Sequence, residues 1–166
     1  MVWVKSEYAG ELAVLSTWLV GLAPWSVSTF SVSGLTVAAF RFLPFRVQYI
    51  FGGTVPGERP FLWVWDIGAF QQTPELGLAG QLGTAAFVCY LVPFWLSIYY
   101  YYEEERVAAL LPVDPVRLFA GFLGLVGLLS LAASALFVRY FAGVTLPVGS
   151  VLALVLASLL ATVDRT

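Results

Sequence analysis

Three long runs without a charged residue limit what this chain can fold into. They are Leu118–Val138, Tyr140–Val163 and Leu76–Tyr102. An α-helix rises about 1.5 Å per residue, so about 20 apolar residues span the roughly 30 Å hydrocarbon core of a bilayer. Each of the three runs is long enough for this span. The sequence therefore predicts three transmembrane helices, at about residues 76–102, 117–138 and 146–163.

A fourth transmembrane helix is predicted near the N-terminus, over about residues 6–25. Glu7 and Glu11 lie in its first turns, where the helix dipole favours acidic side chains. Trp3 precedes this segment and Trp25 ends it, and Trp at both ends of a span is typical of membrane helices. A cleaved signal peptide is the alternative, but such a peptide begins with basic residues. We therefore expect an uncleaved helix.

The composition is that of a membrane protein and argues against several functions. The 166 residues are 60% hydrophobic and 11% charged, with a mean hydropathy of +0.89, whereas soluble domains carry about 25% charged residues. The chain has no His and one Cys, Cys89, which removes most metal sites, His-dependent catalysis and disulfides. Eight basic residues and a net charge of −2 provide no basic patch for nucleic acid.

Residues 26–66 differ in composition from the predicted helices. β-branched and aromatic residues lie there between Gly and Pro, a pattern typical of strands. In Leu35–Phe51 the alternation shifts at Pro44, which predicts a bulge or a sheet edge, and Arg46 and Gln48 fall opposite the apolar face. Because an open sheet is unstable in lipid, we predict a small β-rich module outside the membrane.

The predicted fold is a mainly α membrane protein, with residues 1–166 as one integral membrane domain. It has four transmembrane helices, and a small extracytoplasmic β-rich insert, residues 26–66, lies between the first and the second. Basic residues are tied at four on each side of the predicted spans, and the free N-terminal amine adds to one side. We expect a multi-pass protein of the cell (plasma) membrane with both termini in the cytoplasm.

Small residues recur along one face of each of the last two predicted helices. They let helix backbones approach closely in lipid. We predict that they pack these two helices together within one chain, and docking of another protein or a second copy is the alternative. The positions are Gly124 and Gly127 in the third helix and Gly149, Ala153, Ala157 and Ala161 in the fourth.

No motif in the sequence predicts an enzyme. The chain has no G-x-S-x-G elbow, no Walker loop and no H-E-x-x-H pair, and without His a Ser-His-Asp triad is impossible. The three long runs also hold no charged residue of the kind that proton pumps place inside the bilayer. We therefore expect no catalytic residue, cofactor site or metal site. An intramembrane enzyme that works without His is the alternative.

Two functional classes remain. The first is a non-enzymatic accessory or scaffold subunit, whose partners are the lipid bilayer and a membrane protein or a second copy. Its candidate interaction surface is Phe61, Trp63 and Trp65, because rigid aromatic residues anchor interfaces when exposed. In the competing interpretation, these rings form the module's own core or rest on lipid headgroups. The second class is a small-solute or lipid transport component. An inverted repeat in the sequence would favour this class, and this sequence has no such repeat.

Three segments resemble a known group of proteins. They are Met1–Ser16, Phe45–Gly52 (F-R-V-Q-Y-I-F-G) and Leu111–Arg117 (L-P-V-D-P-V-R). The sequence resembles small haloarchaeal membrane proteins of unknown function, and the likeness covers most of the chain, including the order of helix, β-like insert and three helices. The resemblance implies an archaeal plasma-membrane location, and it implies no activity and no site residue.

Overall fold

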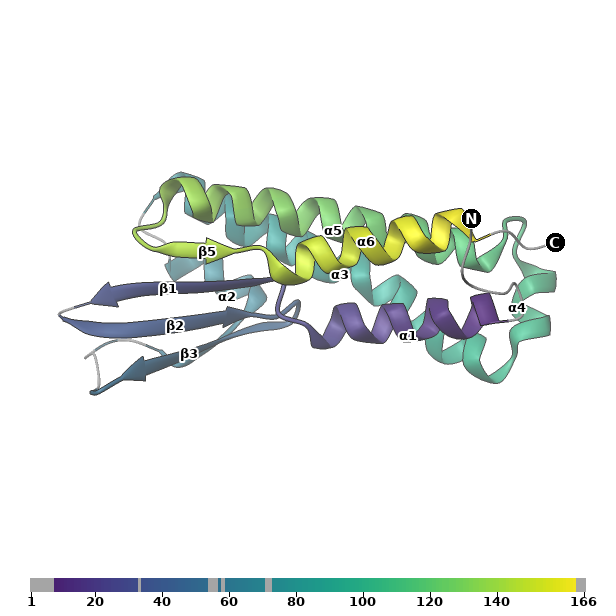
Figure 1. The fold of residues 1–166 in the computed structure, drawn as a ribbon, viewed down its shortest axis with the longest axis horizontal. Coiled ribbons are helices and arrows are strands. Elements are labelled where there is room, and N and C mark those ends of the chain that lie inside the picture. Colours follow the sequence, from purple (N-terminus) through teal and green to yellow (C-terminus); the bar gives the residue numbers. More distant parts are fainter. Residues whose placement is uncertain (1–7, 33, 54–56, 58, 71–72, 164–166) are drawn as a thin grey trace.

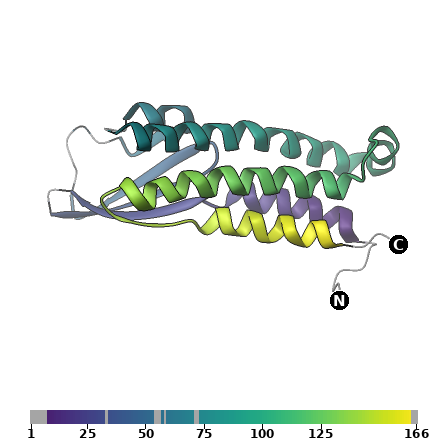
Figure 2. The same cartoon turned by 90° about the horizontal axis from the view of Figure 1, so that it is seen from above.

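Two long helices organise the molecule, α3 (Pro74–Tyr102) and α5 (Pro115–Tyr140). The computed structural model describes residues 8–32, 34–53, 57, 59–70 and 73–163. Figure 2 shows α3 and α5 running side by side along the length of the molecule. The shorter helices α1 (Ala9–Leu22) and α6 (Val148–Thr162) pack along one part of this pair, the helix half, and a sheet packs along the other part, the sheet half (Figure 1).

The sheet has five strands in the described residues, ordered β4-β3-β2-β1-β5, and all neighbours are antiparallel. β5 comes from the segment after α5, so the sheet joins distant parts of the sequence: Ser28 pairs with Thr145, 117 positions away. Short helices α2 (Val64–Ile67) and η2 (Gly68–Phe70) lead into α3, and α4 (Glu104–Leu110) lies between α3 and α5. The strands are β1 (Ser26–Val32), β2 (Leu35–Arg41), β3 (Phe45–Phe51), β4 (Phe61–Trp63) and β5 (Val144–Leu146).

The local sequence determines where the two long helices begin. The Thr73 side chain accepts a hydrogen bond from the Leu76 amide at 3.4 Å, and Asp114 accepts one from the Val116 amide at 3.1 Å. A proline follows each of these capping residues, at a position where the missing amide costs nothing. Both helices start two residues before the predicted 76 and 117, and α5 ends two residues after the predicted 138.

The sheet lies against α3 and α5 and shares their core. Trp25, just before β1, donates from Nε1 to the Phe42 carbonyl at 3.0 Å, and its ring centre lies 6.1 Å from that of Phe137 in α5. Further along β1, Phe30 meets Phe141 edge-on at 4.9 Å. One cluster of buried apolar side chains therefore includes residues from the sheet half and the helix half.

The structure corrects the predicted number of membrane spans. Among the helices in the described ranges, only α3 and α5 are both long enough and apolar enough to cross a bilayer. α1 has 14 residues and α6 has 15, which correspond to only about 21 and 22 Å of helix. The prediction of four transmembrane helices is therefore wrong.

The prediction of a small, separate β insert at residues 26–66 is also wrong. The sheet takes a strand from beyond α5 and covers the two long helices, so it is part of the core. Absence of charge does not distinguish a helix from a strand. Val144 and Thr145 are β-branched and pair with β1, so α6 begins only at Val148.

Leu35–Phe51 forms a hairpin, which corrects the interpretation of Pro44 as a bulge or a sheet edge. The Phe42 amide donates to the Phe45 carbonyl at 2.7 Å, and the chain reverses between β2 and β3. The shift of alternation at Pro44 therefore marks a turn. This turn places residues 41 and 46 directly opposite each other.

Candidate functional site

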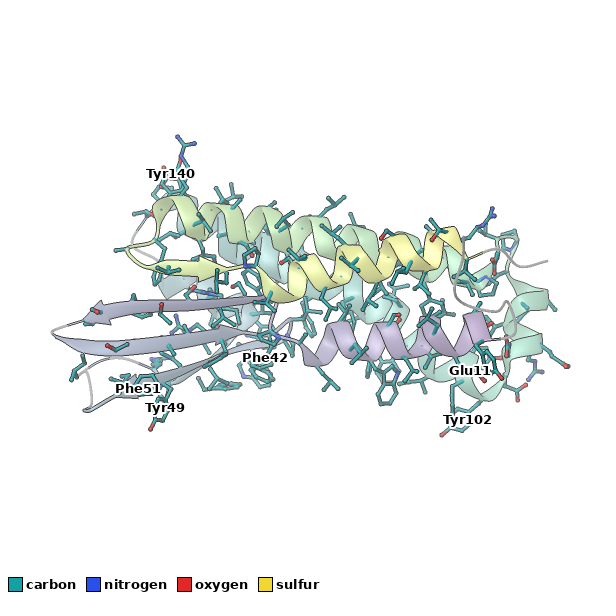
Figure 3. The ribbon with its side chains drawn as sticks, viewed as in Figure 1. Glu11, Phe42, Tyr49, Phe51, Tyr102 and Tyr140 are labelled. Atoms are coloured by element: carbon teal, nitrogen blue, oxygen red, sulfur yellow. The ribbon has the colours of Figure 1, made fainter. Side chains whose placement is uncertain are left out.

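In β3 the two faces of the sheet differ in chemistry. In β3, Arg46 and Gln48 are buried on the inner face, which lies against the helices, whereas Val47, Tyr49 and Phe51 are exposed. Figure 3 shows Tyr49 and Phe51 on the side of the sheet away from α3 and α5. A sheet in a soluble protein usually packs its apolar face inward. β3 reverses this arrangement, while Val37, Ala39 and Leu62 keep apolar side chains on the inner face of the neighbouring strands, so both faces of β3 are candidates for a binding site.

The outer face carries a row of five aromatic side chains in successive contact. The ring centres are 5.0 Å apart between Phe42 and Phe45, 5.4 Å between Phe45 and Phe61, and 5.1 Å between Phe61 and Trp63. Trp63 and Trp65 stack with their centres 5.2 Å apart and their planes 12° from parallel. We call these five residues the aromatic row.

The candidate interaction surface, Phe61, Trp63 and Trp65, forms one end of this row. Their exposed fractions are 43, 44 and 54%, so the described part of the chain does not bury them in a core. Phe61 and Trp63 share the outer face of β4, but Trp65 is in α2, because the strand ends at Trp63. The first turn of α2 brings the Trp65 ring back over Trp63.

Four of the six small residues lie where α5 meets α6. A Cβ added at Gly124 would lie 3.7 Å from the Cβ of Ala157, and one added at Gly127 would lie 2.9 Å from Leu154 Cδ2. Ala153 and Ala157 are buried. A larger side chain at these positions would therefore push the two helices apart.

The other two small residues, Gly149 and Ala161, lie outside this contact. Gly149 packs against the segment that leads into β1: its amide donates to the Pro24 carbonyl at 3.0 Å, and a Cβ there would lie 2.5 Å from the same oxygen. Ala161 is exposed near the end of α6. The small residues that recur every four positions in α6 therefore make two different contacts, with α5 and with the segment before β1, and the last of them lies on the surface.

A cavity of about 440 Å³ lies between the inner face of the sheet and the adjoining ends of α3 and α5. Three arginines line it: Arg41 of β2, Arg46 of β3 and Arg59, two residues before β4. No Asp or Glu is among the described residues of its wall. We call this cavity the arginine pocket. Its other polar wall residues include Gln48, Thr73 and Tyr140.

Arg41 is the most buried of the three arginines, with 1% of its surface exposed. Its Nη1 donates to the Ser28 hydroxyl and lies 3.5 Å from the Ser26 hydroxyl, and its guanidinium carbon is 3.9 Å from the centre of the Phe137 ring. Burial, and to a smaller extent the charge of Arg46, lowers the pKa of Arg41 to about 9. Arg41 therefore remains a cation at neutral pH.

The sequence analysis misses the arginine pocket, because it uses the basic residues of 26–66 to assign strand faces and membrane orientation and does not place Arg41 beside Arg46. A signal is nevertheless present. Arg41 and Arg46 flank the four-residue segment 42–45, so a hairpin there pairs them and directs both side chains to the same face. The assignment of Pro44 to a turn is the missing step.

The described residues offer no comparable site for a metal. Among them, no group of three or more His, Cys, Asp or Glu side chains is close enough to hold an ion. Cys89 is half-buried in α3.

Comparison with known proteins identifies a family for this chain. Among curated proteins there is no match. A family of unknown function (DUF7549) matches residues 2–165, which is nearly the whole chain. This agrees with the expectation of an uncharacterised family, and the chain belongs to the DUF7549 family.

Proposed function

We propose that this chain is a non-enzymatic accessory or scaffold protein of a cell membrane, which binds a partner membrane protein through the aromatic row. The observation that carries the proposal is the row itself, five rings in successive contact on the outer face of the sheet. Exposed, rigid aromatic side chains supply much of the binding energy at protein interfaces. The stacked pair Trp63 and Trp65 is the expected centre of the contact.

Two features support an anchor in the membrane. α3 and α5 have 29 and 26 residues, or about 43 and 39 Å of helix, which exceeds the thickness of a hydrocarbon core. Large apolar side chains also cover the outside of the helix half, a surface that soluble monomers rarely expose to water. They include Leu15, Trp18, Leu19 and Leu22 of α1, Val88, Val92 and Trp95 of α3, and Val151, Val155 and Leu159 of α6.

The position of the row favours a partner that is itself embedded in the membrane. Phe42 lies in the turn beside the C-terminal end of α1, where the sheet half meets the helix half (Figure 3). Pro44 of the same turn lines a shallow groove together with Trp18 and Leu22 of α1. The row therefore continues the apolar surface of the helix half. The archaeal source that the resemblance implies stays a prediction.

Purification of the full chain from native membranes tests this proposal. We expect the double variant Trp63→Ala, Trp65→Ala to lose a stoichiometric partner, while its thermal unfolding in mild detergent stays close to that of the unchanged chain. The matched control is Tyr49→Ala, Phe51→Ala, because both side chains of this pair are also exposed and lie on the same face at the far end of β3.

Three outcomes would contradict the proposal. If the partner remains bound to the tryptophan variant, or if both double variants lose it equally, the row is not the binding surface. If no partner is found, and lipids with a quencher at the headgroup silence the fluorescence of Trp63 and Trp65, the rings belong to the lipid interface instead.

A lipid-handling role is the second candidate, and one observation favours it. The groove beside Pro44 has a volume of about 300 Å³ and an almost wholly apolar wall, which includes Trp18, Phe87, Leu91 and Phe94. An acyl or isoprenoid chain suits such a wall. Leu91→Trp narrows the groove at its rim, so the variant should retain less lipid after detergent purification, as measured by mass spectrometry. Unchanged lipid content would remove this candidate.

A further inference from the structure

We propose that β4 binds an extended segment of a partner protein, which adds to the sheet as a further strand. This inference rests on the proposed function, because it names the part of the partner that meets the aromatic row. Two observations carry it: the backbone groups at the outer edge of β4, and the uncharged surface that surrounds them.

The hydrogen bonds of β4 show which of its backbone groups face β3. The Gln48 amide donates to the Pro60 carbonyl at 2.8 Å. Four residues further along β4, the Val64 amide donates to the Pro44 carbonyl at 2.9 Å. Bonded positions alternate along an antiparallel strand, so positions 60, 62 and 64 are the ones that bond to β3.

The backbone groups of positions 61 and 63 therefore point away from β3. They are the amide and carbonyl of Phe61 and the amide of Trp63, and within the described residues none of these three groups has a hydrogen-bond partner. Proteins usually protect such an edge with charged side chains, a bulge or a covering element. β4 has the sequence F-L-W and carries no charge, so its edge is open to another strand.

The spacing of these groups selects an extended chain as the occupant. Residues two apart in a strand are separated by about 7 Å. An extended segment presents its own amides and carbonyls at the same spacing, whereas a helix bonds these groups internally. Strand addition of this kind takes its affinity from main-chain hydrogen bonds and its specificity from alternate side chains.

The surroundings of the edge indicate which side chains the segment carries. None of the described side chains that the five strands direct to the outer face is charged. Phe61 and Trp63 project to this face and continue into the aromatic row. Side chains of an added strand would lie beside these rings, where aromatic and β-branched residues are favoured. The segment is therefore uncharged, with an apolar residue at every second position.

A second copy of this chain fits the edge poorly. The strands run along the same axis as α3 and α5 (Figure 1). Antiparallel self-pairing of β4 relates two copies by an axis perpendicular to the strands, so the second helix half would be inverted in the membrane. Parallel self-pairing would put the outer face of one sheet beside the inner face of the other. The occupant is therefore a different protein.

Two labelled peptides test the proposal by fluorescence anisotropy with the full chain in an uncharged detergent. Both have the sequence acetyl-T-V-T-V-T-V-T-amide. The first is methylated at every second amide nitrogen and keeps one hydrogen-bonding edge, whereas the second is methylated at every amide nitrogen and keeps none. We expect saturable binding of the first peptide and binding of the second that is weaker by about tenfold or more, because main-chain hydrogen bonds supply the affinity. A benzophenone on the first peptide should crosslink to residues next to β4.

Two variants at one position separate the backbone from the ring. Trp63 has a φ of −68°, the value that proline fixes, and its amide has no partner in the described chain, so Trp63→Pro should fold. Trp63→Ala removes the ring and keeps the amide, whereas Trp63→Pro removes both. We expect Trp63→Pro to bind the first peptide about fivefold or more weakly than Trp63→Ala does, because one hydrogen bond is lost. If Trp63→Pro does not fold, the two peptides and the crosslink decide.

Four results would overturn the proposal. These are no saturable binding of the first peptide, equal binding of the two peptides, crosslinks only to residues away from β4, and equal affinity of folded Trp63→Ala and Trp63→Pro. A dimer of the unchanged chain in light scattering that Trp63→Pro dissociates would also overturn it, since the edge would then hold a second copy. These measurements use no natural partner, so their failure leaves the accessory role to its own purification experiment.

Discussion

At the scale of single residues, Arg41 carries the most deeply buried charge in the described structure. Its charge is almost wholly removed from water, and two serine hydroxyls and two ring faces are weak compensation for hydration. Cation–π contacts contribute about 0.5–2 kcal/mol, less than the desolvation of a guanidinium group. A protein that retains such a residue gives up stability at this position.

Arg41→Met should therefore stabilise the protein. Methionine fills a similar length against Phe137 and carries no charge. We expect a gain of about 1–2 kcal/mol in the free energy of unfolding, within the range seen when buried charges are replaced by apolar residues. Thermal unfolding in mild detergent measures it. A clear loss of stability would show that the hydroxyl and ring contacts outweigh the desolvation cost.

The same residue predicts a dependence on pH. Burial lowers the pKa of Arg41 from its ordinary value to about 9 in the folded chain, so above about pH 9 the unfolded chain binds more protons than the folded one. Stability contributed by this residue therefore rises with pH above about 9, by at most about 1.4 kcal/mol per pH unit. The stability advantage of Arg41→Met should be constant from pH 7 to 8.5 and shrink above pH 9. An advantage that is unchanged at pH 10.5 would contradict this.

At the scale of elements, α5 and α6 depend on small residues at their contact. Ala157 is buried beside Gly124, and Ala161, one turn later on the same helix, is exposed. Both positions carry the same side chain in the same helix. They therefore form a matched pair for a test of packing.

Ala157→Leu should destabilise the protein by about 1–3 kcal/mol, because the added atoms have no space between the two helices. Ala161→Leu should change the stability by less than about 0.5 kcal/mol, as is usual for exposed positions. Thermal unfolding of the two variants in the same detergent measures the difference. Equal melting of Ala157→Leu and the unchanged chain would show that this face does not pack.

Some helices and strands of this fold can be predicted from the sequence, and others cannot. α3 and α5 could be predicted within two residues at each end, because length and lack of charge define a long apolar helix. The run Tyr140–Val163 could not, because charge alone does not separate the strand at Val144–Leu146 from the helix that follows. The strand pairs with β1, more than 100 residues earlier, and this partner determines its conformation.

The two candidate sites also differ in how far they could be predicted, because one depends on local sequence and the other on contacts between distant residues. Phe61, Trp63 and Trp65 could be selected from their spacing alone, although the sequence did not indicate that α2 begins between the two tryptophans. The arginine pocket could not be recognised. It forms only when the hairpin brings Arg41 and Arg46 together and the ends of α3 and α5 close over them.

At the scale of the whole molecule, the two halves share their framework. α3 and α5 contribute one end to the sheet half and the other to the helix half, and the buried cluster extends through both (Figure 1). A sheet attached only by its ends would unfold separately. Here the loss of the sheet would uncover part of both long helices.

Leu62→Ala tests this coupling. Leu62 in β4 is buried and belongs to the shared cluster, so the substitution should cost about 2–5 kcal/mol. We expect the helical circular dichroism signal at about 222 nm and the tryptophan fluorescence to lose their folded values together, at a lower temperature than in the unchanged chain. A helical signal that melts at its original temperature would show that the sheet is a separate unit.

The pairing of β1 with β5 has a consequence for the order of synthesis. β2 follows β1 directly and can pair with one edge of it early, but the other edge has no neighbour until residues 144–146 leave the ribosome. An open strand edge is a template for pairing with other chains. For most of its translation this protein therefore carries an incomplete sheet, and nascent chains that stop before residue 144 retain that exposed edge.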